Sequence, residues 1–463
     1  MTMLSTLLLQ SANTITVQII FALALTLLLS FLKLPEIFLF GLLSYVHPDD
    51  VAAPNNTSSG LKAAIRRPGT YDAAEPNKPR KKPKEKFEFD EQKAQIFRIK
   101  LNDSHLRTRR YFNEFSGAFN STIIALSCLL LHKFQPVSKD LGVLRNGSAV
   151  PILLGLVCVC RVALLLAKVS WEGSASKRSE RQLSVLLGAI MFLVGLNILF
   201  GVVPTCILDF DLDSLDGFGK LSIAIFMGCI AGFLYVPALR NARAFWIGTD
   251  QIRCNLSIIS GGLFSRMLLY ANFLMALFTS LLWFSPFCEL LINQNIDGTK
   301  GSYLPIRKGH DFKLAGNLGF SRSDFDKFRV WCLLISGILQ LVSLRQNVQM
   351  FLNEAVLCWY QRLHASKVPQ LDYSRAKVFL HNHNLCLAVL QFFGPSALIL
   401  LFLGLSHTRD DLLTNFRLAC SFLPCSALTK ELALYMAWFV VFVWATLTSV
   451  VLALYRRGII YVS

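Results

Sequence analysis

The chain of 463 residues is 54% apolar and only 16% charged, and it carries a formal net charge of +17. A soluble domain has about 25% charged residues, so this composition excludes an ordinary soluble protein. Roughly 20 consecutive apolar residues are needed for one helix to cross the hydrocarbon core of a membrane. The apolar runs here are continuous, which excludes the alternating pattern of a transmembrane β-barrel.

Nine apolar runs are candidates for membrane-crossing helices, and the second of them is the shortest. In chain order they lie at about 8–32, 115–132, 149–169, 183–203, 219–239, 266–288, 326–344, 384–405 and 432–455. The sequence therefore predicts an all-α, polytopic helical membrane protein with about nine transmembrane helices.

The first run begins an N-terminal unit over residues 1–46. No basic region precedes this run and Lys33 follows it, which indicates an uncleaved span with its N-terminus outside rather than a signal peptide. The stretch "KLPEIFLFGLLSYVHP" (33–48) is a second, shorter apolar run. It predicts an interfacial helix that ends at Pro48.

Residues 47–112 differ from the rest of the chain because they are polar, proline-rich and basic. Such a composition cannot bury enough apolar surface to fold, so the sequence predicts a largely disordered cytoplasmic segment here. The stretch "FEFDEQKAQIFRIKL" near its end is richer in aromatic residues, and we expect it to pack at the membrane-proximal surface. Residues 113–463 then form an eight-span helical bundle.

The segment 47–112 contains a basic block. Its members are Lys78, Arg80, Lys81, Lys82, Lys84 and Lys86. One interpretation is a solvated loop that helps to fix the orientation of the protein. The other is contact with anionic lipid headgroups, which is worth about 1 kcal/mol per basic residue near the membrane surface. Nucleic acid is not an expected partner of a loop that is tethered between two spans.

The distribution of Lys and Arg predicts the orientation of the chain. With the N-terminus outside and the C-terminus in the cytoplasm, the cytoplasmic segments hold about twice as many basic residues as the outside ones. The connection between the sixth and seventh runs is the discordant one. Asn146 lies in an outside connection and is a glycosylation candidate. Cys420 and Cys425 lie in another and are candidates for a disulfide.

The seventh run continues without a helix breaker into "LRQNVQMFLNEA" (344–355). At 100° per residue, one face of this helix is apolar, made of Leu341, Leu344, Val348, Phe351, Leu352 and Ala355. A second face carries a stripe at every fourth residue, Arg345, Gln349 and Asn353. A third carries Gln340, Asn347 and Glu354, seven residues apart. Two interpretations are open: an interface-packing helix whose stripes face water, or one wall of a hydrated vestibule.

The fifth run leaves the membrane in a similar way, as "LYVPALRNARAFW", and predicts a second amphipathic extension. Arg240 and Arg345 are 105 residues apart in matching positions. This spacing fits either a duplicated two-span unit or a chance similarity between two amphipathic helices.

Polar residues inside the runs are the other candidates for a functional role. A charge near the bilayer centre costs about 2.5–3.5 kcal/mol on insertion scales, so Arg161 is expected to face protein or water, or to extend towards the headgroups. Asn272 and Gln391 are expected to hydrogen-bond between helices, which is more typical of packing than of ligand binding. His381 and His383 form H-x-H, but on a helix they point about 200° apart, so joint metal binding is not expected.

Motifs that carry enzymatic or channel chemistry are missing from the sequence. It contains no phosphate-binding lysine loop, no H-E-x-x-H, no G-x-S-x-G and no potassium-filter sequence, and no paired Asp or Glu lies within the runs. We therefore expect no enzymatic activity, no catalytic residue, no cofactor and no metal site.

Four stretches together resemble the transmembrane protein 161 family. They are "YVPALRNARAFW", "NFLMALFTSLLWFSPF" (272–287), "FRVWCLLISGILQLVSLRQNVQMFLNEA" (328–355) and "LQFFGPSALILLFLGL" (390–405). The motif residues include Pro237, Arg240, Asn272, Trp283, Pro286, Arg329, Trp331, Arg345, Gln349, Asn353, Gln391 and Pro395. "YVHP" at 45–48 also looks like the family's N-terminal end. The motif-dense part covers about 220–405, and the chain departs from the animal pattern after Arg240.

The resemblance implies an eight-to-ten-span membrane protein without known enzymatic activity, and a link to ion currents and membrane excitability. The expected function is therefore to modulate or support ion homeostasis, with the polar helices after the fifth and seventh runs as the working surface. One alternative is an anion-leaning channel or transporter lined by Arg161, Arg240 and Arg345. Another is a scaffold or assembly factor for a membrane-protein partner. A lipid-modifying enzyme is disfavoured by the missing catalytic clusters.

Overall fold

The structure is a computed structural model. It describes residues 2–47, 62–65, 95–134, 149–172, 178–201, 208, 210, 217–250, 262–291, 321–365, 371–407 and 426–460. The basic block at 78–86, Asn146, Cys420 and Cys425 lie outside the described residues, so the predictions made for them are untested.

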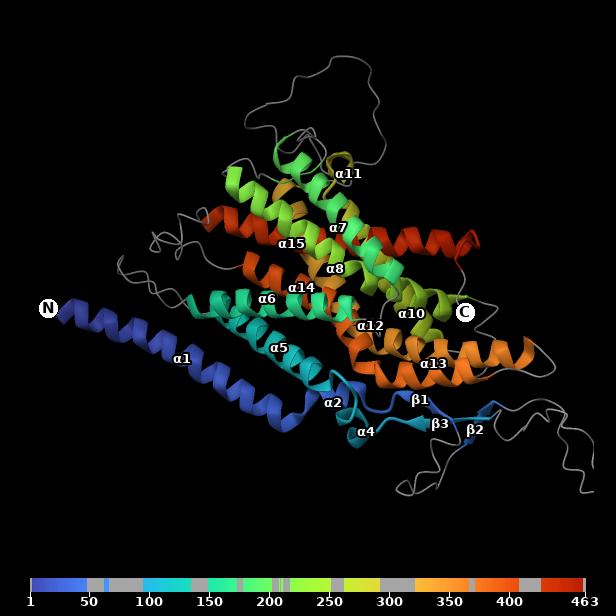
Figure 1. Cartoon of the computed structure of the whole chain (residues 1–463). Coiled ribbons are helices and arrows are strands. Elements are labelled where there is room, and N and C mark those ends of the chain that lie inside the picture. Colours follow the sequence, from blue (N-terminus) through green and yellow to red (C-terminus); the bar gives the residue numbers. More distant parts are fainter. Residues whose placement is uncertain are drawn as a thin grey trace, which may run out of the picture.

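The described residues form a helical bundle with one small sheet (Figure 1). The helices are α1 (Thr2–Leu32), α2 (Leu34–Leu39), α4 (Asp103–Arg107), α5 (Phe112–Phe134), α6 (Ala149–Trp171), α7 (Arg178–Leu199), α8 (Gly217–Thr249), α10 (Leu263–Leu281), α11 (Ser285–Leu291), α12 (Arg322–Ala365), α13 (Asp372–His383), α14 (Leu385–Ser406) and α15 (Ser426–Arg456). The strands are β1 (Leu43–Val46), β2 (Lys62–Ile65) and β3 (Ile96–Lys100).

Eight helices in the described part of the chain are long and apolar enough to cross a membrane. They are α5, α6, α7, α8, α10, α12, α14 and α15, and they coincide with the second to ninth apolar runs. The first run lies in α1, a helix of 31 residues whose stretch Thr16–Leu32 is apolar. The prediction of an all-α, polytopic membrane protein is confirmed. The two chain ends lie at opposite ends of the molecule (Figure 1).

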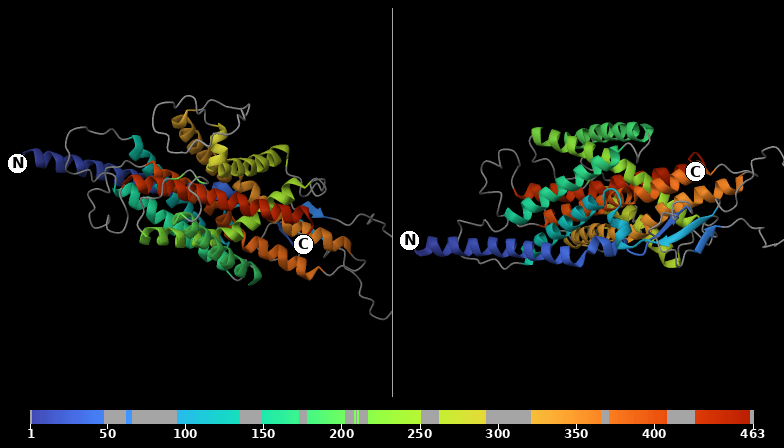
Figure 2. Two further views of the ribbon diagram at one scale, coloured as in Figure 1. Left: turned by 90° about the horizontal axis from the view of Figure 1, so that it is seen from above. Right: turned by 60° about the horizontal axis from the view of Figure 1, so that its bottom comes forward.

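Helix α14 is the centre of the bundle. Of the 18 most apolar consecutive residues of α14, 94% are buried. The same share is 17% in α7, which lies at the periphery. Helices α5, α6, α12 and α15 pack around α14, and α7 packs mainly against α8. Helix α1 lies at the edge of the bundle, where it contacts α5 and α6 (Figure 2).

Helix α6 exchanges side-chain hydrogen bonds with α8 and α14, and one of them compensates for the proline inside α8. Pro237 in α8 has no N–H to donate to the carbonyl four residues earlier, and the hydroxyl of Ser170 donates to that carbonyl, of Phe233, over 2.9 Å. Val169 lies in the last turn of α6, where carbonyls lack intrahelical donors. The amide of Gln391 in α14 donates to it over 3.3 Å.

Helices α8 and α12 carry the predicted extensions without a break. Helix α12 has 44 residues and is therefore roughly 66 Å long, about twice the thickness of the hydrocarbon core. The apolar face predicted for its second half is buried, since Leu344 and Val348 are fully inaccessible. We call the end of the bundle where α8, α12 and α15 finish and α7 begins the polar end.

The small sheet lies at the polar end and was not predicted from the sequence. Its strand order is β1-β3-β2 and both pairs are antiparallel. The interfacial helix expected over 33–48 is shorter than predicted, because α2 ends at Leu39 and Gly41 then takes a positive φ of 76°. The segment 47–112, expected to be largely disordered, contributes β2, β3 and α4 within its described parts.

An aromatic cluster closes the opposite end. The ring of Trp283 stacks on Phe210 at 4.4 Å, and the guanidinium of Arg329 lies 4.0 Å from the centroid of Trp283. Tyr435 and Trp438 from α15 complete the cluster. It ties the start of α12 to α15 and to the end of α10.

Candidate functional site

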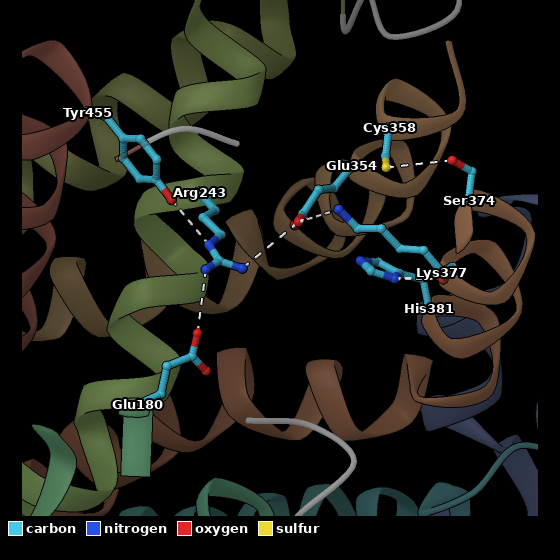
Figure 3. Close-up of polar contacts among 8 residues, drawn as sticks. All are labelled: Glu180, Arg243, Glu354, Cys358, Ser374, Lys377, His381 and Tyr455. Carbon is cyan, nitrogen blue, oxygen red and sulfur yellow. Dashed lines mark hydrogen bonds and ion pairs between the residues drawn. The ribbon is translucent and has the colours of Figure 1, made fainter. Parts of the chain in front are cut away.

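Two groups of side chains meet at the polar end. The first, which we call the amide clamp, consists of Gln349 and Asn353 on α12 and Asn382 on α13, and it holds β1. The second, which we call the charge cluster, joins α7, α8, α12, α13 and α15 and is shown in Figure 3. Its members are Glu180, Arg243, Glu354, Lys377, His381 and Tyr455.

In the amide clamp, Gln349 binds the backbone of Leu43 in the way that a neighbouring strand would. Its Oε1 accepts from the N–H of Leu43 over 2.9 Å, and its Nε2 donates to the carbonyl of Leu43 over 3.1 Å. Backbone groups that leave water need such partners. One side chain of α12 therefore satisfies both backbone groups of this strand residue.

Asn382 and Asn353 hold the next two residues of β1. The carboxamide of Asn382 accepts from the hydroxyl of Ser44 over 2.8 Å and donates to the carbonyl of Tyr45. The Tyr45 hydroxyl donates to Oδ1 of Asn353 over 3.2 Å. Tyr45 is almost fully buried, and this burial raises its pKa. The clamp thus fixes β1 by its backbone and by one buried aromatic ring.

The clamp shows what the stripe of Arg345, Gln349 and Asn353 faces. Arg345 donates to the carbonyl of Phe40 over 3.0 Å, just before β1, so all three residues contact the segment 40–45. The stripe therefore packs against the N-terminal part of the same chain. Asn353 is buried, Gln349 is partly buried and Arg345 remains exposed, so the stripe turns from solvent towards the protein along the helix.

In the charge cluster, Arg243 is the branching residue (Figure 3). Its guanidinium lies 3.5 Å from the carboxylate of Glu180 on α7 and 3.9 Å from that of Glu354 on α12. It also donates to the hydroxyl of Tyr455 on α15 over 3.1 Å. One arginine on α8 thereby reaches three other helices.

Glu354 connects this arginine to α13. Its carboxylate is buried and lies 3.4 Å from the ammonium of Lys377. A buried carboxylate is strongly destabilising unless its charge is paired. The two cations therefore stabilise the charged form of Glu354, and they fix the position of α13 against α12.

His381 lies beside this pair. Its Nδ1 is 2.9 Å from the carbonyl of Lys377, and its ring stacks on Phe351 at 4.5 Å. Burial lowers the pKa of His381 to about 4, although Glu354 opposes the shift. His383 instead stacks on Phe379, so the two histidines point apart as predicted.

Arg161, Arg240 and Arg345, which would line the anion path of a channel, do not lie together in the structure. Arg161 on α6 is exposed and lies against Gly117 of α5. Arg240 lies 5.4 Å from the ring of Phe351, and Arg345 binds the carbonyl of Phe40. Each therefore has a different partner on a different element.

The other two polar residues predicted inside the spans, Gln391 and Asn272, lie between helices of the bundle. Gln391 joins α14 to α6, as described above, and Asn272 is buried on α10. Within the described ranges, no group of three or more His, Cys, Asp or Glu side chains lies together as metal ligands do.

Arg243, Lys377 and Asn382 were not among the residues predicted from the sequence. Arg243 follows Arg240 by three residues, and Lys377 precedes His381 by four, so each pair shares one helix face. That spacing could have indicated that these basic residues share a helix face. It does not indicate which distant carboxylate they contact.

Residues 216–412 match the family model described as predicted transmembrane protein 161AB. The match covers α8 to α14, which includes Arg243, the amide clamp and most of the charge cluster. It confirms the resemblance seen in the motifs. No solved structure matches the chain.

We expect Gln349→Leu to weaken the attachment of β1. It removes both hydrogen bonds to Leu43 and leaves a backbone N–H and C=O to find new partners, which costs about 1–3 kcal/mol. Hydrogen exchange of the Leu43 amide, read by mass spectrometry, should then accelerate roughly 5- to 150-fold. Gln361→Leu, at an exposed position of α12, is the matched control and should leave the exchange rate unchanged. Equal rates in wild type and Gln349→Leu contradict the clamp.

We expect acid to destabilise the protein through His381. Because its folded-state pKa of about 4 lies below the ordinary value of about 6.5, the unfolded chain binds more protons between these two pH values. This contribution is therefore fully present above pH 6.5 and is lost as the pH falls towards 4. His381→Gln and His381→Phe should both show a smaller fall in thermal melting temperature across that window. If the melting temperature of both variants falls with pH as steeply as that of the wild type, His381 is not the group responsible.

Proposed function

We propose that this chain, which belongs to the transmembrane protein 161 family, is a multi-pass membrane protein that modulates or supports ion homeostasis without enzymatic chemistry. The polar end is its working surface. The link to ion currents rests on the family resemblance, and most of the residues that carry the resemblance lie on α8, α10, α12 and α14.

The observation that best supports this proposal is the branching of Arg243. A guanidinium that binds α7, α12 and α15 makes the positions of these helix ends interdependent. Separating one member of a buried ion pair is costly, because the other charge is left unpaired. A membrane protein that influences others through its conformation needs an element of this kind.

The positions of the three arginines favour a modulator of ion homeostasis over an anion channel or transporter lined by basic residues. Arg161, Arg240 and Arg345 have separate partners, on α5, on α12 and on the stretch before β1. The path that the alternative requires would bring them to one shared surface.

We further propose that the N-terminus is outside and the C-terminus is cytoplasmic, as the basic residues favour. The polar end then faces the cytoplasm. In the sequence, the basic block at 78–86 lies between β2 and β3, and β3 pairs with the clamped strand β1. Contact of this block with anionic lipids is part of the proposal.

The proposal is tested by recording whole-cell currents with and without the protein and by flux assays on purified protein in liposomes. We expect no flux of anions or cations in liposomes, and an altered cell current with wild type. Arg243→Gln should reduce that alteration by more than half. Arg457→Gln, which removes an exposed arginine near the end of α15, is the control and should behave as wild type.

Each other outcome contradicts the proposal in a distinct way. Flux from the purified protein that falls in Arg161→Ala or Arg345→Ala identifies a channel or transporter. An unchanged cell current, together with a stable membrane-protein partner that is lost on mutation of Arg345, Gln349 or Asn353, identifies a scaffold.

A further inference from the structure

Helix α12 carries a second polar stripe that faces the inside of the bundle. At 100° per residue, Ser336, Gln340, Ser343, Asn347 and Glu354 fall within about 60° of one another. Their exposed fractions are 0, 3, 0, 4 and 7%. A line of buried polar side chains along most of a membrane-crossing helix is unusual, because lipid and apolar neighbours leave them without partners.

The direction of this stripe follows from the contacts on either side of it. Helix α10 lies on one side, where Ser265 donates to Oε1 of Gln346 over 2.9 Å. Helix α14 lies on another, since Gly337 faces Leu400. The stripe occupies the angle between these two sides and is directed at α8 and α15.

One contact across the interior confirms that direction. Nδ2 of Asn347 donates to Oδ1 of Asn241 on α8 over 3.2 Å, and Asn241 donates to Thr448 on α15 over 3.4 Å. These residues are also buried. The interior between α8, α12 and α15 is therefore polar at this level.

Several polar atoms of the stripe have no hydrogen-bond partner among the described residues. They are Oγ of Ser336, both Nε2 and Oε1 of Gln340, and Oδ1 of Asn347. Oδ1 of Asn272 on α10 likewise has no hydrogen-bond partner among the described residues. Helices α10 and α12 are antiparallel, and two hydrogen bonds, from Ser265 to Gln346 and from Thr279 to Cys332, fix their register. In this register Asn272 lies opposite residue 339, next to Gln340.

The chemistry of these atoms identifies their ligand. A carboxamide offers a donor and an acceptor whichever way it is turned, and a hydroxyl offers both. Water matches this mixture, since it donates and accepts, and buried water typically serves otherwise unsatisfied polar groups. A metal cation matches it poorly, because Gln340 presents a donor and because Arg240, Arg243 and Lys377 outnumber the two carboxylates of the charge cluster.

We propose that α12 holds a file of ordered water molecules inside the bundle, which runs from Ser336 along Gln340 and Asn347 to the ion pairs of Glu354. The file runs from residue 336 to residue 354, or roughly 27 Å of helix. It goes beyond the proposed function and does not depend on it. The water lets side chains of α12 exchange hydrogen-bond partners when α8 or α15 shifts, and it gives the buried carboxylate of Glu354 a hydrated neighbour.

The file is tested by water-edited solid-state NMR on the full chain in lipid bilayers, with the side-chain amides of Asn and Gln labelled with ¹⁵N. In this experiment magnetisation passes from water protons only to amides that contact water. We expect the Gln340 and Asn347 amides to receive it as fast as exposed amides do. Asn382 is the matched control, because it is also buried but has protein partners on both of its polar atoms, and its signal should stay weak.

The two stripe signals are assigned by their loss in Gln340→Met and in Asn347→Leu. If one variant fails to fold, the other still assigns its own amide. Signals of Gln340 and Asn347 as weak as that of Asn382 mean that the stripe is dry, which overturns the proposal. Strong signals from both, with a weak Asn382, support it.

Discussion

The arrangement of the polar end depends on one buried charge, the carboxylate of Glu354. A carboxylate inside a helical bundle must be paired, and here the ammonium of Lys377 and the guanidinium of Arg243 both approach it. Because Arg243 also binds Glu180 and Tyr455, the same charge indirectly sets where α7 begins and where α15 ends. The amide clamp extends this order to the N-terminal strand, since Gln349 lies on the same helix as Glu354.

The family motifs coincide with contacts between elements that are distant in the sequence. Trp283 and Arg329 belong to different motifs, and they stack on one another at 4.0 Å. Gln349 holds a strand 306 residues away, and Gln391 joins α14 to α6. The motifs therefore describe how this bundle is assembled, which explains why they show no catalytic spacing.

The membrane-crossing helices and the buried face of α12 could be predicted, because length, hydropathy and a period of 3.6 residues are local properties of the sequence. The small sheet could not, since its strands have only four or five residues and one pairs across the basic segment. The partners of the stripes could not be predicted either. Periodicity sorts Gln349 from Glu354 onto different faces, but one sequence does not say that β1 covers the first and that Arg243 meets the second.

If Arg243 and Glu354 act as one unit, their contributions to stability are coupled, and a double-mutant cycle on thermal unfolding measures that coupling. Arg243→Gln, Glu354→Gln and the double variant are compared with wild type in the same detergent. Coupled charges predict that the double variant loses less stability than the two single losses together, by about 1 kcal/mol or more. Losses that add to within about 0.5 kcal/mol would mean that the two charges are independent.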